Sequence, residues 1–461
     1  MIILKENLLD LNSKSQKKLF LDIKLILCLA IPVILENILQ TLLSTTDTLF
    51  ASKLNSNAIA AIGATNLIMN IYIAVFTFIG VGTTVLIARN IGAGKIDEAN
   101  EVVKQSIILS VLIGIFLGII NFMLAKQILV FLGITPEVLK YAIPYFKAVS
   151  IPSIFLCLSM TLGSSLRGAG DTKKPMLAGI VANISNIILN YILMFGIFNF
   201  HGLGILGSGL ATTIARIISS TILLIYFFNG TTILKIDLKS KWTLDKGILR
   251  FICKIGGPAG MEKFIMRIGQ LIYGFIIISL GTQSYVAHNI AGTIESYSYL
   301  PAMGFAVVAS TMVGQNLGKN NPLEAKRYAL ISNVLSTIFM VCIGIIFFTT
   351  APFLAKEFTR NIQTQNLVIS VVRIIALFQP LLSLTFVISS ALQGAGDTKF
   401  PMYLTFIGIW GIRIVFGYTF AIIFNLGLIG IWIAYSIDIS FRGIILLIRF
   451  LKGKWTTTML H

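Results

Sequence analysis

Five acidic residues lie inside long apolar stretches of the sequence. They are Glu36, Asp47, Glu262, Glu295 and Asp438. If those stretches cross a membrane, each carboxylate costs about 2.5–3.5 kcal/mol even on the lenient insertion scale. An acid kept at that cost is a candidate for moving a proton, binding a cation or holding helices together.

Two helical faces gather polar residues in otherwise apolar sequence. At 100° per residue, the members of each set fall within about 80° of arc on one side of a helix. We therefore expect both stripes to face protein or water rather than lipid. The first consists of Glu36, Gln40, Ser44 and Asp47, and the second of Asn183, Asn186 and Asn190.

The composition identifies the elements that carry these stripes. Of 461 residues, 56% are apolar and 12% charged, against roughly 45–50% and 25% in soluble domains. Runs such as 107–124 and 217–228 are apolar on every face, without the alternation of a membrane β-barrel strand. The sequence therefore predicts an all-α integral membrane protein.

Positive charge gives the expected orientation. The net charge is +18, and most basic residues lie in the N-terminal segment, in the loops after even-numbered spans and in the C-terminal segment. This is the positive-inside pattern, which predicts a multi-pass cell-membrane protein with both termini in the cytoplasm, and no nucleic-acid partner. Because residues 1–24 are lysine-rich and lack a cleavage-site pattern, we expect a cytoplasmic leader there.

Hydropathy predicts twelve transmembrane helices in two lobes. We expect an N-lobe over 25–229, a polar cytoplasmic linker over 230–246 and a C-lobe over 247–461. The predicted helices are 25–50, 58–88, 102–125, 141–165, 175–198, 203–228, 247–279, 284–314, 325–350, 367–391, 401–424 and 427–450.

The two lobes are copies of one repeat. SSLRGAGDTKKPM, from Ser164, and SALQGAGDTKFPM, from Ser390, match at ten of thirteen positions and are 226 residues apart. The same offset aligns Arg216 with Arg442. Six spans per repeat make the repeats parallel, an arrangement that places a pathway between two bundles. We expect each GAGDTK segment to be a tight turn, with glycine in the turn and Asp as a cap.

The repeat separates the acids into two kinds. Glu36 aligns with Glu262, which favours a shared architectural role as much as a role in transport. Asp47 aligns with Tyr273, and the three asparagines align with apolar residues. Only the N-lobe therefore has a polar interior. Because Asp47 has no cation partner evident from the sequence, we expect burial to favour its neutral form.

The sequence resembles the multidrug and toxic compound extrusion (MATE) transporters over nearly the whole chain. The resemblance rests on PVILENILQTLLSTTDTLFASKL in the first span, the paired LRGAGDTKKPM and LQGAGDTKFPM turns, NISNIILNYILMFG in the fifth span, and GMEKFIMRIGQ and MVGQNLG in the second half. It implies a V-shaped pair of six-helix lobes around a central cleft. It also implies alternating-access export of amphipathic, mostly cationic drugs against inward proton or sodium flow, without ATP, cofactor or metal.

The resemblance places the coupling carboxylate at Asp47 and two further polar positions at Asn186 and Asn190; we add Gln40 to this N-lobe polar cavity. Proton-coupled relatives of one branch have a second Asp where this chain has Asn190. Sodium-coupled relatives have acids at the position of Met266 and in the tenth span, and both are absent here. We therefore expect proton rather than sodium coupling, membrane lipids as surroundings and a monomer, with Glu36, Glu262 and Glu295 as secondary candidates.

Basic residues inside the spans have open roles. Arg442 is four residues after Asp438, the helical spacing of an ion pair. Arg267 and Lys263 flank Glu262 in the same way. Arg413, with no acid nearby in sequence, could snorkel, pair across helices or attract anions. His288 could shuttle protons or be a plain helix contact.

Two other functions compete with drug efflux. A flippase for a lipid-linked intermediate would need a cationic cavity, for which Arg267 and Arg413 are candidates. An intramembrane enzyme would need a catalytic motif, but the sequence contains no HExxH, GxSxG or paired catalytic Asp. We therefore expect a transporter and no enzymatic activity.

Overall fold

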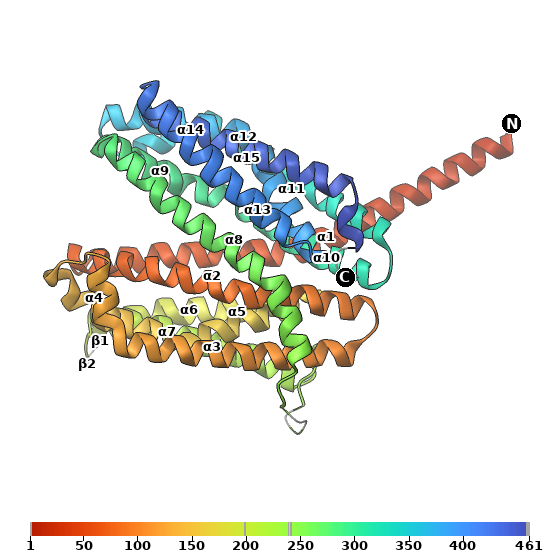
Figure 1. The fold of residues 1–461 in the computed structure, drawn as a ribbon, viewed down its shortest axis with the longest axis horizontal. Coiled ribbons are helices and arrows are strands. Elements are labelled where there is room, and N and C mark those ends of the chain that lie inside the picture. The colour runs from red at the N-terminus through yellow and green to blue at the C-terminus, as the bar shows by residue number, and fades with distance from the viewer. Residues whose placement is uncertain (1, 198–199, 238, 240–241, 458–461) are drawn as a thin grey trace.

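The computed structural model describes residues 2–197, 200–237, 239 and 242–457. Its helices form two bundles (Figure 1). The N-lobe contains α1 (Ile2–Ser52), α2 (Ser56–Gly92), α3 (Ile96–Phe131), α4 (Pro136–Ser150), α5 (Ser153–Gly168), α6 (Lys173–Phe195) and α7 (Ile205–Phe228). The C-lobe contains α8 (Lys246–Ser279), α9 (Thr282–Ser298), α10 (Leu300–Gly318), α11 (Pro322–Phe358), α12 (Ile362–Gly394), α13 (Lys399–Phe406), α14 (Val415–Tyr418) and α15 (Gly427–Leu451).

Each of the twelve predicted spans coincides with a helix or a run of helices, which confirms the fold class. The fourth span is the pair α4 and α5, which are bent by 45° at the break formed by Ile151 and Pro152. The eleventh span runs from α13 to α14 through two π-helical segments, η1 (Ile407–Ile414) and η2 (Thr419–Ile423). Within the described residues, eight helices are long and apolar enough to cross a membrane, or nine if the bent pair is one span.

Parts of the segments outside the predicted spans contact the lobes, while the N-terminal end of α1 projects away from them (Figure 1). Helix α1 continues through most of the predicted leader, and the Asp22 carboxylate there accepts a hydrogen bond from Tyr328 Oη on α11 at 2.9 Å. The chain between α7 and α8 lies against α3, where Gln105 Nε2 donates to Thr243 O at 2.7 Å. A two-stranded hairpin, β1 (Gly196–Ile197) and β2 (Phe200–His201), connects α6 to α7.

The GAGDTK segments are tight turns, as predicted. Gly170 and Gly396 have φ of +90° and +89°, a left-handed conformation that glycine adopts at little cost. Helix α6 begins at Lys173, and Asp171 Oδ1 accepts the Lys174 backbone N–H at 3.2 Å. The side chain therefore satisfies one of the N–H groups left free at the helix start.

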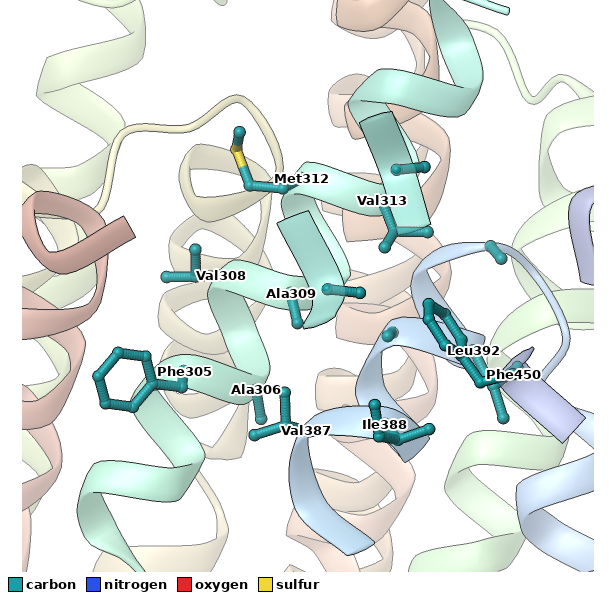
Figure 2. Packing of buried hydrophobic residues seen from close by; sticks show 14 of the residues in the cluster. Phe305, Ala306, Val308, Ala309, Met312, Val313, Val387, Ile388, Leu392 and Phe450 are labelled. Carbon is teal, nitrogen blue, oxygen red and sulfur yellow. The ribbon is translucent and has the colours of Figure 1, made fainter. Parts of the chain in front are cut away.

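The apolar core repeats the two-lobe pattern. Each lobe has one cluster near the chain termini and one near the opposite end. Figure 2 shows the C-lobe cluster near the termini, where Ala306 of α10 lies beside Val387 of α12. Leu392 and its repeat counterpart Leu166 are both fully buried. The repeat therefore extends from sequence to packing.

The lobes meet at the end that carries both termini and diverge toward the opposite end (Figure 1). Where α2 crosses α10, a Cβ on Gly92 would lie 1.9 Å from Gln315 O, and a Cβ on Gly318 would lie 2.1 Å from Arg89 O. These two contacts are exchanged by the repeat offset, so the crossing is nearly two-fold symmetric. Small residues let helix backbones approach in this way inside membranes.

Candidate functional site

The N-lobe interior brings Asp47 together with two of the predicted asparagines. Asn190 Nδ2 on α6 donates to Asp47 Oδ1 on α1 at 2.6 Å. In the amide orientation that satisfies both of its ends, Asn186 donates to the same oxygen at 3.3 Å and accepts the Thr212 backbone N–H at 3.2 Å. Both asparagines are fully buried, whereas Asp47 is half-buried. The carboxylate is therefore held by neutral donors and keeps an exposed side.

Gln40 and Ser44 do not join this group. Both are exposed on α1, and within the described residues no hydrogen bond connects either side chain to Asp47. Of the polar stripe on α1, Asp47 is hydrogen-bonded to α6, whereas Gln40 and Ser44 are exposed.

Arg216 lies one turn after Thr212 on α7, the residue whose backbone N–H donates to Asn186. Its Nη1 donates to Val149 O on α4 at 2.9 Å, and among the described residues no hydrogen bond or ion pair joins it to Asp47. The sequence analysis did not place Arg216 beside this site. The available signal was the alignment of Arg216 with Arg442, because a basic residue repeated inside two spans needs a nearby acid or other acceptors.

Glu36 and Glu262 hold equivalent positions in the two lobes. Arg167 Nη1 lies 3.3 Å from both Glu36 oxygens, and Gln393 Nε2 donates to Glu262 Oε2 at 3.0 Å. Arg167 and Gln393 are repeat counterparts that lie just before the GAGDTK turns. Thr405 Oγ1 also donates to Glu262, at 3.0 Å. Each acid therefore ties the first helix of its lobe to the helix that ends at the turn, which fits the architectural role.

The basic residues flanking Glu262 do not pair with it. Arg267 is exposed and donates to Gln270 Oε1 at 3.1 Å. The predicted pairing of Glu262 with Arg267 or Lys263 is therefore wrong, because amide and hydroxyl donors from other helices occupy both oxygens of the carboxylate.

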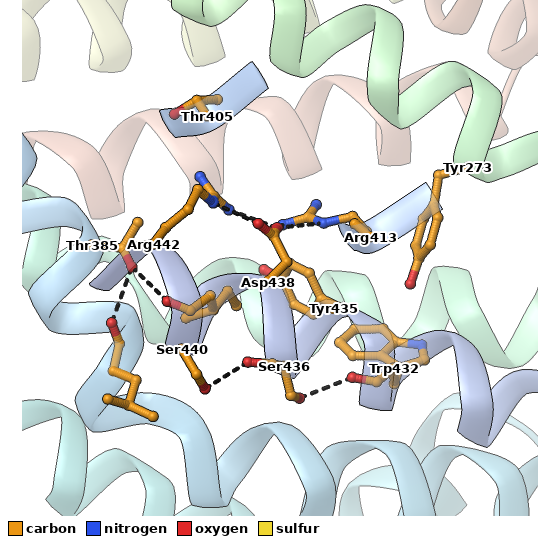
Figure 3. Close-up of polar contacts among 12 residues, drawn as sticks. Tyr273, Thr385, Thr405, Arg413, Trp432, Tyr435, Ser436, Asp438, Ser440 and Arg442 are labelled. Carbon is orange, nitrogen blue, oxygen red and sulfur yellow. Dashed lines mark hydrogen bonds and ion pairs between the residues drawn. The ribbon is translucent and has the colours of Figure 1, made fainter. Parts of the chain in front are cut away.

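In the C-lobe, Asp438 lies between two arginines (Figure 3). Arg442 Nε donates to Asp438 Oδ1 at 2.7 Å, which confirms the predicted pair, and Arg413 Nη2 lies 2.6 Å from Oδ2. Arg413 belongs to η1, and its guanidinium carbon lies 4.2 Å from the centre of the Tyr435 ring. Of the three roles left open for Arg413, the structure selects pairing across helices.

Glu295 and His288 complete the buried polar part of the C-lobe, so the expectation that only the N-lobe has a polar interior is wrong. Tyr435 Oη donates to Glu295 Oε1 at 2.6 Å. The His288 ring lies 5.5 Å from the Trp432 ring, centre to centre, and its Nδ1 has no hydrogen-bond partner among the described residues. Asp438 is fully buried, and both of its oxygens are bound by arginines. The Asp438 carboxylate is therefore shielded from solvent, whereas the Asp47 carboxylate of the N-lobe keeps an exposed side.

A pocket of about 980 Å³ lies away from Asp47, at the termini end. It is lined by α2, α3, the chain before α8 and the start of α8, and includes Glu98, Glu101 and Lys104. Lys104 pairs with Glu101 at 2.5 Å, and Lys95 pairs with Glu98 at 2.8 Å. Two of the acids that line it, Glu98 and Glu101, are therefore each paired with a lysine. Within the described residues no three His, Cys, Asp or Glu side chains gather as a metal site would require.

Known proteins match both repeats and the whole chain. The MatE family model matches residues 32–192 and 258–419, two segments that begin 226 positions apart. A probable multidrug resistance protein NorM of Thermotoga maritima is 33% identical over 93% of this chain and 92% of that relative. An uncharacterized transporter, YisQ of Bacillus subtilis, is 31% identical over 92% of this chain and 93% of its own length.

Solved structures agree in fold. A MOP superfamily transporter from Pyrococcus furiosus, whose reversed binding-pocket polarity was taken to suggest a different function, is 25% identical with a TM-score of 0.88, covering 95% of this chain and 96% of its own. An outward-facing multidrug resistance MATE family transporter gives a TM-score of 0.88 at 24% identity, covering 94% and 97%. Since the family model matches both repeats and relatives align along nearly the whole sequence, the chain belongs to the MatE family of membrane transporters.

Proposed function

We propose that the protein is a secondary multidrug antiporter of the cell membrane that exports amphipathic cations in exchange for protons. The observation that carries this proposal is the half-buried Asp47 carboxylate, which accepts a hydrogen bond from Asn190 at 2.6 Å. The C-lobe has no acid at the equivalent position, which is Tyr273. A carboxylate whose hydrogen-bond donors are neutral can take up and release a proton. A carboxylate bound by two arginines, like Asp438, does not readily take up a proton.

Exchange follows from competition for one group. The ionised Asp47 attracts a cationic substrate into the N-lobe. A proton arriving from outside neutralises the carboxylate, removes that attraction and lets the surrounding helices repack, so the substrate leaves. Release of the proton into the cytoplasm restores the anion. Because proton and drug exclude one another at Asp47, inward proton flow drives outward drug movement.

The packing of the lobes supports alternating access. With the termini in the cytoplasm, the Gly92–Gly318 crossing closes the cytoplasmic end, and the divergence of the lobes in Figure 1 opens the outer end. Residues Thr311 and Gln315 of α10 donate to the carbonyls of Arg167 and Gly168 at 3.0 and 3.1 Å, and add polar contacts across the closed end. We take this arrangement as the outward-facing state of a monomer driven by the ion gradient without ATP.

The C-lobe charges weigh against the flippase alternative. A pyrophosphate would need free cations, but Arg413 is bound to Asp438, which leaves only Arg267, hydrogen-bonded to the neutral Gln270, of the two arginines considered for that role. For the coupling ion, the C-lobe has no acid at Met266 or in the tenth span, where sodium-coupled relatives carry one. This favours protons over sodium.

The test is uptake of a fluorescent cationic dye into inside-out vesicles, energised in turn by a pH gradient and a sodium gradient. We expect uptake with an acidic lumen, and little with a sodium gradient alone. Uptake driven only by sodium would overturn the proton assignment, and uptake under neither gradient, with transport of a labelled lipid pyrophosphate instead, would support the flippase.

A further inference from the structure

The pocket of about 980 Å³ at the termini end is bounded by parts of both lobes. The end of α2 and the start of α3 line it from the N-lobe, and the start of α8 lines it from the C-lobe. The chain between α7 and α8 is held beside it, because Asn100 Oδ1 accepts the Lys235 N–H at 2.9 Å and Gln105 Oε1 accepts the Asp245 N–H at 3.1 Å. Pockets that bind small organic molecules typically measure about 300–1,000 Å³. The space is therefore large enough for such a ligand.

Acidic side chains predominate in the lining of this pocket. Five of its charged residues are acids and three are bases, in a chain whose net charge is +18. The acids are Asp97, Glu98, Glu101, Asp237 and Asp245, and the bases are Arg89, Lys104 and Lys235. Leu86, Ile248 and Phe251 add apolar surface. Because a hollow lined by an excess of one charge attracts the opposite charge, this lining suits an organic cation with an apolar part.

The repeat shows which cation the pocket lacks. Glu98 aligns with Glu324, at the start of α11 in the C-lobe. There, Nζ of Lys18 on α1 lies 2.7 Å from Glu324 Oε1. The residue that aligns with Lys18 is Leu244, just before α8. The N-lobe therefore keeps the acid but lacks the lysine that approaches its C-lobe copy.

Local pairs leave this acid open to a ligand. Glu98 lies 2.8 Å from Lys95 on the same helical turn, but its side chain is 58% exposed, against 24% for Glu324. Exposed pairs of this kind are weak. Within the described residues, the neighbouring Asp97 has no hydrogen bond or ion pair. An ammonium group that enters the pocket can therefore reach both carboxylates.

We propose that this pocket binds an amphipathic organic cation whose ammonium group lies beside Glu98, as that of Lys18 lies beside Glu324. The apolar part of the ligand packs against apolar side chains of the lining such as Phe251. The site is separate from Asp47 and goes beyond the proposed exchange, because binding here requires no transport. Since α2, α3 and α8 all bound the pocket, the ligand contacts both lobes near the end where they meet.

The first test measures equilibrium binding of dansylcadaverine, a fluorescent aromatic group joined to a primary ammonium. The protein is the full chain with Asp47→Asn, in detergent, so that the Asp47 carboxylate cannot hold the dye. We expect saturable binding that Glu98→Gln weakens several-fold. Glu324→Gln is the matched control. It makes the same change at the repeat counterpart, where Lys18 already occupies the acid, and should leave binding unchanged.

The second test supplies the missing lysine. Leu244→Lys gives the N-lobe the residue that the C-lobe has at Lys18, and position 244 is 56% exposed, so the longer side chain has room. We expect dye binding to weaken several-fold, because the new ammonium group reaches Glu98. Leu244→Met, which has a long uncharged side chain, should bind the dye as before. Inorganic phosphate at constant ionic strength should not displace the dye.

Each outcome decides the inference. It would be overturned if the Asp47→Asn protein bound no dye saturably, if neither Glu98→Gln nor Leu244→Lys weakened binding, or if Glu324→Gln weakened it equally. Displacement by phosphate would make the pocket an anion site and would also overturn it. If Leu244→Lys fails to fold, the two glutamine variants decide alone. Because this binding needs no export, a protein that exports no dye but shows the Glu98 effect would refute the proposed function and leave this site standing.

Discussion

Asn190 Nδ2 donates to Asp47 Oδ1 at 2.6 Å, while the Asn190 carbonyl oxygen has no partner within the described structure. An amide has a donor and an acceptor end of nearly the same shape. The ionised Asp47 accepts from the amide nitrogen, and a protonated Asp47 could donate to the oxygen after the amide rotates. Asn190 can therefore serve both protonation states, which a second carboxylate could not do without taking up a proton.

Replacing that amide by an acid should change the pH dependence of export. In Asn190→Asp two carboxyl groups would share one site, and they cannot readily ionise together. We expect the pair to retain one proton to higher pH, so that the pH profile of dye export moves in the alkaline direction. The profile is measured in proteoliposomes over a series of internal pH values. A profile identical to that of the wild type would mean that residue 190 does not contact the coupling group.

Asp47→Asn should fold and insert but lose gradient-driven export. Asparagine mimics the neutral acid and can still bond Asn190, so the N-lobe keeps its packing while it loses its exchangeable charge. Dye uptake into inside-out vesicles under a pH gradient measures the loss.

The matched controls are Glu36→Gln and Glu262→Gln. These acids are bound by Arg167 and by Gln393 with Thr405, so both variants should keep part of the export activity. Wild-type export by Asp47→Asn would exclude it as the coupling site and direct the search to Glu295, which is buried and bonded to Tyr435.

Local patterns predicted the elements and the repeat correctly. The 226-residue offset, read from the two GAGDTK segments, holds for the turns at Gly170 and Gly396 and for the buried pair Leu166 and Leu392. These features follow from residues close in sequence, or from the copying of one unit. The prediction that the asparagine stripe faces the protein interior holds for Asn186 and Asn190, which are both fully buried. Helical spacing alone determines that these two residues share one face of α6.

Contacts between helices could not be predicted in the same way. Arg413 binds Asp438, which lies 25 residues later in the sequence, and Asn190 on α6 binds Asp47 on α1, 143 residues earlier. Such pairs depend on how helices rotate and cross, which periodicity within one helix does not specify. For the same reason Gln40 shares a helical stripe with Asp47 yet stays outside its hydrogen-bonded group.

Asp438→Asn should destabilise the protein strongly. The change leaves Arg413 and Arg442 buried side by side without the carboxylate that both bind. Removal of one partner from a buried ionic group costs about 3–5 kcal/mol. We expect a marked fall in the thermal unfolding midpoint of the detergent-solubilised protein. Glu98→Gln, which removes one member of an exposed pair with Lys95, should leave the midpoint nearly unchanged. Equal midpoints in the two variants would contradict the structural role of the triad.

Gly92→Ala should open the end of the molecule that carries the termini. A Cβ there would lie 1.9 Å from Gln315 O, a backbone atom that cannot move aside without separating α2 from α10. Gly318→Ala should do the same, because its Cβ would lie 2.1 Å from Arg89 O. Gly63→Ala is the matched control: it lies on the same helix α2, and its added Cβ would meet nothing within 4 Å.

Spin labels on cysteines introduced at Glu98 and Leu323 report this opening, because the two exposed positions lie at that end of the N-lobe and C-lobe respectively. Electron–electron distance measurements should show a longer population in Gly92→Ala and Gly318→Ala, and the wild-type distribution in Gly63→Ala. If the lobes alternate about this crossing, both glycine variants should also export dye more slowly, because the closed state that they disfavour is one half of the transport cycle. Unchanged distances with slower export would place the effect of the two glycines elsewhere than at the closed end.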